Sequence, residues 1–293
     1  MSVSMKDIVE LNAKHVHIKN KDEVINKINL LITGGKDSLQ VVSDYDMTLT
    51  KQHENGKQHV TSFGMIHKCR SMSKEYYQKE QKLYREYRPI EIDPYMPNEE
   101  KVKHMEHWWR KSEDLLKGIS LPVEEFDEVA KIYNPALRDG TADMISDLYK
   151  ENVPVLVFSA GLGDSVVAVL KHNQVLHPNV KVISNYLDRD ENNKILGYRG
   201  NMITVLNKNE QVLKGTEYYD LVQNRGNVIL MGDHVGDAGM AEGVPHRNTV
   251  LKIGFLYDSV DVCLPEYLDA FDIVLIDDQT MDVPRALIKL IVN

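Results

Sequence analysis

The stretch "VVSDYDMTLTKQ", residues 41 to 52, indicates both the fold and the site, because an apolar run ends there in two aspartates separated by one residue. The branched apolar residues before Asp44 are typical of a buried strand. Asp44 and Asp46 would repel each other at its end unless a cation or a shared proton holds them. The pair predicts either a metal site or a division of acid and base work between two carboxyls. A solvated acidic turn is the competing interpretation.

Similar apolar runs recur along the chain and indicate further strands. With residues 39–46 as the first, they are 153–161, 180–188, 227–233, 249–256 and 272–278. Near-continuous apolarity is typical of parallel strands covered on both faces, and helix-like segments lie between the runs. We therefore predict an α/β fold with a Rossmann-like parallel sheet, in which ligands bind at the carboxyl ends of the strands.

The first two predicted strands are separated by about a hundred residues, far more than one crossover needs. Within this stretch three segments, near residues 71–87, 97–116 and 126–133, place apolar side chains at helical spacing. We therefore expect a core formed by residues 1–55 and 138–293, with a helical cap subdomain inserted at 56–137.

Net charge, hydropathy and cysteine content limit the partners and the compartment that we expect for this protein. The net charge of −9 over 293 residues disfavours a nucleic acid polymer, and no apolar run is long enough to predict a membrane span. The two cysteines, Cys69 and Cys263, are too few for a disulfide framework, so a reducing compartment, the cytoplasm, is expected. The acidic surface, with no conspicuous apolar patch, favours a monomer.

Three more polar clusters lie at strand or loop ends. Ser159 in "FSAGLGD" (158–164) precedes a helix start, a pattern that can hold a phosphate, although such turns are common. Lys208 lies in the polar stretch "VLNKNE" (205–210), where a lone lysine is usually solvated. Asp233 and Asp237 in "LMGDHVGD" (230–237) end another strand, and a third carboxylate suits a hard cation such as Mg²⁺.

In chain order, D-x-D-x-T, Ser, Lys and G-D-x-x-G-D resemble the motifs of the haloacid-dehalogenase-like phosphohydrolases. The stretches "YDMTL", "HPNVKVISN", "GTEYY" and "LKIGFL" extend the likeness over nearly the whole chain, which resembles the cytosolic 5'-nucleotidase III family. This resemblance implies a haloacid-dehalogenase-like core and Mg²⁺-dependent hydrolysis of nucleoside 5'-monophosphates.

The resemblance also implies roles for the motif residues. Asp44 would be the nucleophile that forms an aspartyl-phosphate, and Asp46 the general acid and then the general base. Mg²⁺ would be held by Asp44, the Asp46 backbone carbonyl and Asp233. Behind them, Thr48 would orient the turn, and Asp237 would fix a metal-bound water or Lys208.

The substrate would be held from both sides. Ser159, the Ala160 N–H and Lys208 would bind the remaining phosphate oxygens. Ser112 matches a cap serine that the family brings to the substrate. Glu91 in "YRPIEIDP" (87–94) matches an acidic residue, in the loop after the first cap helix, that reads the base edge. Alternatively, Glu91 is only the exposed face of an extended segment.

Phe63 and Trp109 stand where pyrimidine-preferring relatives tend to carry histidine and tyrosine. An aromatic pair can sandwich a base, and it gains most from a cationic base such as 7-methylguanine. This resembles the 7-methylguanosine phosphate-specific branch of the family. The competing interpretation assigns Trp109, with Trp108, to an apolar helical stripe in the core.

The expected activity is hydrolysis of 7-methyl-GMP and also CMP to nucleoside and phosphate. One alternative is a pyrimidine-specific nucleotidase, acting on UMP and CMP, with phosphotransferase activity. Another is a protein that binds cap nucleotides without catalysis, which would not need Asp44, Asp46 and Lys208 together.

Overall fold

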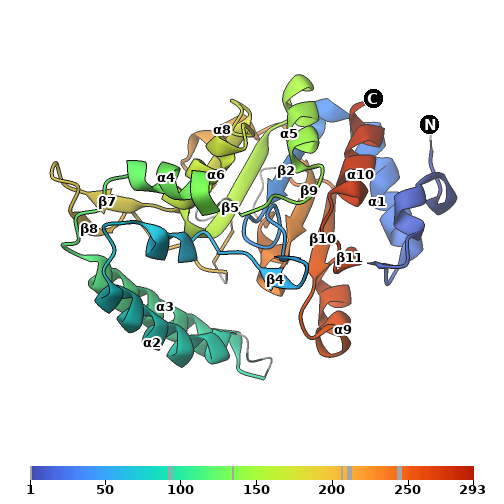
Figure 1. The fold of residues 1–293 in the computed structure, drawn as a ribbon. Coiled ribbons are helices and arrows are strands. Elements are labelled where there is room, and N and C mark those ends of the chain that lie inside the picture. The colour runs from blue at the N-terminus through green and yellow to red at the C-terminus, as the bar shows by residue number, and fades with distance from the viewer. Residues whose placement is uncertain are drawn as a thin grey trace.

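A seven-stranded sheet forms the centre of the molecule (Figure 1). The structure is a computed structural model and describes residues 2–91, 93, 95–133, 135–205, 207–209, 213–242 and 246–293. In spatial order the strands are β1 (Val16–His17), β11 (Ile273–Ile276), β10 (Val250–Leu256), β9 (Asn227–Gly232), β2 (Leu39–Ser43), β5 (Val155–Leu162) and β6 (Val180–Asn185). All neighbouring pairs are parallel except β1 with β11. The predicted parallel α/β sheet is confirmed.

Helices cover both faces of this sheet, which explains the continuous apolar runs. One face packs against α1 (Lys21–Gly34), α5 (Thr141–Lys150), α6 (Gly163–His172) and α10 (Asp282–Val292), and the other against α8 (Glu217–Leu221) and α9 (Val260–Ala270). The neighbouring residues Val41 and Val42 of β2 belong to the cores on opposite faces. Both are fully buried, so neither position tolerates a polar side chain.

Each of the six predicted runs contains one strand of the sheet. The run 180–188 continues beyond β6 into β7 (Leu187–Arg189), which pairs with β8 (Ile195–Tyr198) in a hairpin. Strand β8 was not predicted, nor were strand β1 and the hairpin of β3 (His53–Glu54) and β4 (Lys57–Gln58). Strands of two residues are too short to produce a period of two in the sequence.

The segment predicted as the cap contains the short 3-10 helix η4 (Gly64–Lys68) and the helices α2 (Lys74–Glu91), α3 (Asn98–Leu116) and α4 (Glu124–Tyr133). Helices α2 and α3 pack against each other as a helical hairpin, which we call the cap hairpin, and it stands apart from the sheet in Figure 1. Helix α4 instead packs on α6, and Phe126 and Ala130 belong to the main core. The boundaries 56–137 remain a prediction.

One end of the cap hairpin is tied to the β7–β8 hairpin. Just after α3, Gly118 N donates to Ile195 O at 2.8 Å and Leu121 N donates to Asn193 O at 2.9 Å. Within α3, Glu113 accepts a hydrogen bond from Tyr198 N at 2.9 Å. The end of α3 is therefore held by a structure that continues directly from β6.

Helices α2 and α3 contain 18 and 19 residues, and both are rich in charged side chains. Length alone would let either cross a bilayer, but their polarity would not. Among the residues that the structure describes, no helix combines the length and apolarity that a membrane span requires.

Candidate active site

The predicted polar clusters meet at the carboxyl ends of three adjacent strands. Asp44 follows β2, Ser159 lies near the end of β5, and Asp233 follows β9, on the other side of β2. The Asp44 N–H donates to Met231 O at 2.9 Å, which holds the start of the loop against β9. Because parallel strands all end at the same edge, residues more than a hundred positions apart share one site.

Lys208 lies inside this site and not on the surface. Its side chain is 1% exposed, and its ammonium group donates to Asp44 and, at 2.9 Å, to Asp237. Burial alone would lower the pKa of Lys208, but the charges of Asp237 and Asp44 outweigh it and raise the pKa above its ordinary value. The interpretation of Lys208 as a solvated loop lysine is wrong, because two buried carboxylates bind it.

Three carboxylates form a group suited to a cation. Asp44, Asp233 and Asp237 each place one oxygen within 4.8 Å of the others. Burial is the largest cause that raises the pKa of Asp44 to about 7, and it also raises that of Asp233 well above the ordinary value. One lysine faces three carboxyls, so negative charge remains for a divalent cation to neutralise.

The two aspartates of the G-D-x-x-G-D motif differ in the hydrogen bonds that their carboxylate oxygens accept from the protein. Asp237 accepts from Lys208 on one oxygen and from His234 N, at 3.0 Å, on the other. Asp233 accepts a longer hydrogen bond, 3.4 Å, from the Thr48 hydroxyl. Asp233 is therefore the better candidate for a direct ligand, and Asp237 is committed to holding Lys208 in place.

Asp46 is held separately from this group of three carboxylates. Ser62 donates to both carboxyl oxygens, from its N–H to Oδ1 at 2.7 Å and from its hydroxyl to Oδ2. Burial raises the pKa of Asp46, and the two hydrogen bonds from Ser62 partly oppose this. A raised pKa favours the protonated form that a general acid needs. Ser62 was not predicted as a site residue, because a lone serine in a loop belongs to no motif.

The backbone after Ser159 lies close against Asp46. Ser159 is buried, and its hydroxyl accepts from Gly161 N at 3.0 Å. A Cβ on Gly161 would lie 1.9 Å from the Ser62 hydroxyl oxygen and 2.9 Å from Asp46 Oδ2, so only glycine fits. Ala160 lies between Ser159 and Gly161 in the chain, and its carbonyl accepts a hydrogen bond from the Asn185 side chain at 2.8 Å.

A buried arginine, also missed from the sequence, holds the loop after β2. Arg138 donates to Thr48 O at 2.7 Å, to Met47 O and to Asp278 O, and its guanidinium lies 3.9 Å from the centre of the Phe255 ring. Burial lowers its pKa to about 10. Met47 has a φ of 60°, which is costly for a side-chain-bearing residue, so the turn needs such support. Thr48 is buried within it, as its predicted orienting role requires.

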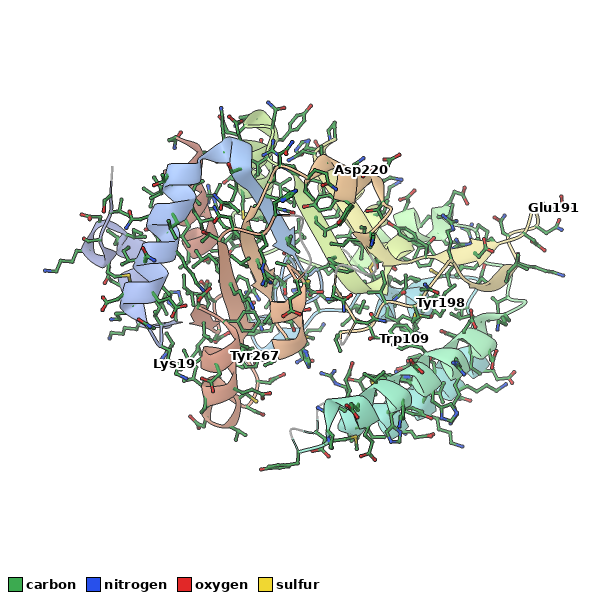
Figure 2. All side chains as sticks on the ribbon, turned by 180° about the vertical axis from the view of Figure 1, so that it is seen from behind. Lys19, Trp109, Glu191, Tyr198, Asp220 and Tyr267 are labelled. Atoms are coloured by element: carbon green, nitrogen blue, oxygen red, sulfur yellow. The ribbon has the colours of Figure 1, made fainter. Side chains whose placement is uncertain are left out.

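The cap hairpin presents Trp109 toward the rest of the molecule, beside Tyr198 (Figure 2). The Trp109 ring lies 5.5 Å from Phe63 and 5.9 Å from Tyr198, in both cases edge to face. Trp108 instead stacks on Tyr87 within the cap hairpin, at 5.8 Å and 10°. Trp109 is thus the tryptophan available to the site. Phe63 and Trp109 are neighbours but not parallel, so a base between them would require the rings to separate.

Glu91 is the last residue of α2, so both predicted placements, in a loop or in an extended segment, are wrong. Proline usually ends a helix, but α2 continues two residues past Pro89 while packing along α3. Glu91 forms an ion pair with Arg88 and is 18% exposed. Ser112, the other predicted cap residue, is buried in α3.

The end of α2 faces the loop after β9. Burial lowers the pKa of His234, and the charges of both Glu91 and Arg88 act on that histidine. His234 Nδ1 accepts from Gly236 N at 3.0 Å, so a neutral ring carries its proton on Nε2. Glu91 and Arg88 are therefore near enough to the loop after β9 for their charges to act on His234.

Comparison of the sequence with known proteins identifies a family model and a group of similar proteins. The family model described as pyrimidine 5'-nucleotidase (UMPH-1) matches residues 47–292. A Drosophila melanogaster protein named 7-methylguanosine phosphate-specific 5'-nucleotidase is 49% identical over 290 residues, which cover 98% of this chain and 90% of that protein. Both matches include those polar clusters of the site that come after Met47 in the chain.

Comparison of the structure agrees. The crystal structure of cytosolic 5'-nucleotidase IIIB bound to cytidine has a TM-score of 0.95 and is 47% identical, covering 99% of this chain and 97% of that one. A substrate-bound phosphoserine phosphatase, 19% identical, has a TM-score of 0.50 over 83% of this chain and 94% of its own. The second likeness concerns the fold alone, which is the haloacid-dehalogenase-like fold that the motifs predict.

Proposed function

This chain belongs to the pyrimidine 5'-nucleotidase (UMPH-1) family, and on that premise we propose that it is a Mg²⁺-dependent 5'-nucleotidase acting preferentially on 7-methyl-GMP and also on CMP. The names of its relatives support a phosphoric monoester hydrolase. The observation that carries the proposal is the grouping of the buried Asp44 and Lys208 with the half-buried Asp46 and Asp233. A binding protein would gain nothing from burying this much charge.

In the first step, an oxygen of Asp44 attacks the phosphorus of the substrate. The bond between phosphorus and O5′ breaks while Asp46 gives its proton to O5′, so the nucleoside leaves with a neutral hydroxyl. Asp44 then carries the phosphoryl group as an aspartyl-phosphate. The separate hydrogen bonds of Asp46 to Ser62 suit this role, because they keep the acid apart from the nucleophile's lysine.

In the second step, Asp46 takes a proton from water as the water oxygen bonds to phosphorus. The bond to Asp44 breaks, which releases inorganic phosphate and restores the carboxylate. Through both steps Lys208, the Ser159 hydroxyl and the Ala160 N–H hold the other phosphate oxygens. Mg²⁺, held by Asp44, Asp233 and the Asp46 carbonyl, would supply charge neutralisation at the phosphate.

Recognition of the base would fall to Phe63, Trp109 and Glu91, with Ser112 contributing from α3. Trp109 faces the site, and Glu91 can accept from the ring N–H and amino group of guanine. The cytidine in the related crystal structure supports CMP as a second substrate. The same observation, with the family description, favours the pyrimidine specificity of the alternative, a pyrimidine-specific nucleotidase with phosphotransferase activity.

The direct test is phosphate release from 7-methyl-GMP, CMP, UMP, GMP and AMP, each with Mg²⁺ and with EDTA. We expect 7-methyl-GMP to be hydrolysed fastest and CMP next, with EDTA silencing both. UMP and CMP turnover without 7-methyl-GMP turnover would select the pyrimidine-specific alternative. No Mg²⁺-dependent release from any nucleotide would refute the nucleotidase proposal.

Mg²⁺ should also stabilise the fold, a readout that needs no turnover. At about 100 times its dissociation constant, a ligand of the folded state stabilises by about 2.7 kcal/mol, so the melting temperature should rise by several degrees over the EDTA sample. Asp233→Asn should lose this rise, whereas Asp269→Asn, which alters only an exposed ion pair with Lys19, should keep it. A full rise in Asp233→Asn would place the metal elsewhere.

Trp109→Ala should reduce kcat/KM for 7-methyl-GMP about tenfold more than for CMP, because a cationic base loses the larger attraction to an aromatic ring. The matched control is Trp108→Phe, since Trp108 packs on Tyr87 inside the cap hairpin. That variant should lower kcat/KM for 7-methyl-GMP and for CMP by the same factor. Equal losses for Trp109→Ala would mean that Trp109 only packs against Phe63 and Tyr198.

We also propose a cytoplasmic monomer whose partner is the nucleotide and not a nucleic acid polymer. The cytosolic name of the related crystal structure and the net charge of −9 support this. Light scattering at micromolar concentration would measure the mass directly, and 33.5 kDa is the value expected for one chain.

A further inference from the structure

We propose that Ser62 is a positioning residue that orients the Asp46 carboxyl for proton transfer. The inference rests on the proposed function and adds to it a residue outside the four motifs. Ser62 is fully buried in the loop that leads from the β3–β4 hairpin to η4. It contributes two donors, one to each oxygen of a single carboxyl group.

A general acid must keep its proton directed at the departing oxygen, and a carboxyl can rotate about its terminal bond. Two donors from one residue fix the plane of the Asp46 carboxyl, since the N–H and the hydroxyl of Ser62 reach opposite oxygens. A carboxylate has about four acceptor positions. Ser62 fills one on each oxygen and leaves the others for the leaving group and water.

The Asp46–Ser62 pair lies against the backbone that follows Ser159. The Cβ position of Gly161 is 1.9 Å from the Ser62 hydroxyl oxygen, 2.9 Å from Asp46 Oδ2 and 3.2 Å from the Ser159 hydroxyl oxygen. The serine, the acid and the proposed phosphate-binding residue therefore converge on one point of backbone.

The same loop also carries a proposed base contact. Phe63 follows Ser62 directly and contacts Trp109 of α3. One short segment thus sets both the aromatic wall and the orientation of the acid. Ser62 touches neither the reacting phosphorus nor the nucleophile in this scheme, so its effect on the reaction passes through Asp46.

The test is Ser62→Ala, measured as kcat/KM with CMP or 7-methyl-GMP and with 4-nitrophenyl phosphate. This parameter reports steps up to departure of the leaving group. A nucleoside needs a proton to leave, whereas 4-nitrophenolate does not. We expect a loss of about 10- to 100-fold on the nucleotide and less than about threefold on the aryl phosphate. Equal losses on both substrates would overturn the proposal.

Thr61→Ala is the matched control. Thr61 lies in the same loop, and its hydroxyl accepts from Gly64 N at 3.1 Å, so the variant perturbs the loop beside Asp46. It should stay within about threefold of the unaltered protein on both substrates. A discriminating loss in Thr61→Ala, equal to that in Ser62→Ala, would show that general loop disorder is the cause.

A double-mutant cycle gives an independent answer that needs only the nucleotide substrate. If Ser62 acts through Asp46, Ser62→Ala should cost nothing further in an Asp46→Asn background. Full additivity of the two losses would contradict the proposal. Failure of the unaltered protein to release phosphate from any nucleotide would instead refute the proposed function, so the two failures are distinguishable.

Discussion

Asp44→Asn should abolish phosphate release from 7-methyl-GMP and CMP, with a loss of at least about 10⁴-fold. Removing the nucleophile of a covalent mechanism leaves only binding and charge stabilisation, and losses of this size or larger are usual. The fold should survive, because the amide oxygen of asparagine can still accept from Lys208, and one carboxyl whose pKa is raised to about 7 by burial is removed.

Three measurements make this result specific. Hydroxylamine should trap an acyl phosphate on the unaltered protein during turnover and none on Asp44→Asn. Asp46→Asn, the comparison variant, should lose about 10²- to 10⁴-fold. Asp44→Asn should still bind the nucleotide by calorimetry. If it retained more than about 1% of the activity, Asp44 would not be the nucleophile.

Lys208→Met should combine a loss of activity of about 10³-fold with a loss of stability of about 3 to 5 kcal/mol. The ammonium binds Asp44 and Asp237 in a fully buried site, and removing one partner of a buried ion pair leaves the other charges uncompensated. Lys36→Met is the control, because Lys36 and Glu151 form an exposed pair and such pairs contribute about 0 to 1 kcal/mol.

The loss of stability in Lys208→Met should depend on pH. Without the lysine charge, the pKa of Asp44 in the folded state rises further above its unfolded value. A raised folded-state pKa gives stability that is present at low pH and is lost as pH rises through that pKa. Urea unfolding in EDTA should therefore show a larger deficit at pH 8 than at pH 5.5. A deficit that grows toward low pH would mean that Lys208 does not compensate these carboxyls.

Much of this arrangement could be predicted because its determinants are local. Strands β2, β5 and β9 are continuous apolar runs, and the polar residues that follow them directly must meet at the sheet edge. Asp44, Ser159 and Asp233 needed no other information. The covered strands and the position of the catalytic edge therefore follow from patterns only a few residues long.

The remainder depends on contacts between distant residues. Arg138 binds a turn 90 residues away, and Ser62 reaches Asp46 across 16 residues. Neither pairing leaves a trace in local sequence. From the sequence, Lys208 would be predicted as a solvated lysine in a polar loop, because its burial against two carboxylates depends on tertiary contacts.

Helix α4 shows the same limit in the fold. Its apolar face is clear from residue spacing, but the spacing does not say whether it packs on the cap hairpin or, as the structure shows, on α6. An amphipathic pattern specifies that a face is buried and not which element buries it.

Because the end of α3 is attached to the β7–β8 hairpin, any rotation of the cap hairpin about that attachment would move its residues in proportion to their distance from it. Helix α3 has 19 residues, or about 28 Å. A swing of about 10° about its tied end would move Trp109, seven residues from Leu116, by about 2 Å. The same swing would carry Glu91, at the far end of α2, by about 5 Å. The position of Glu91 would therefore be more sensitive than that of Trp109 to the angle of the cap hairpin.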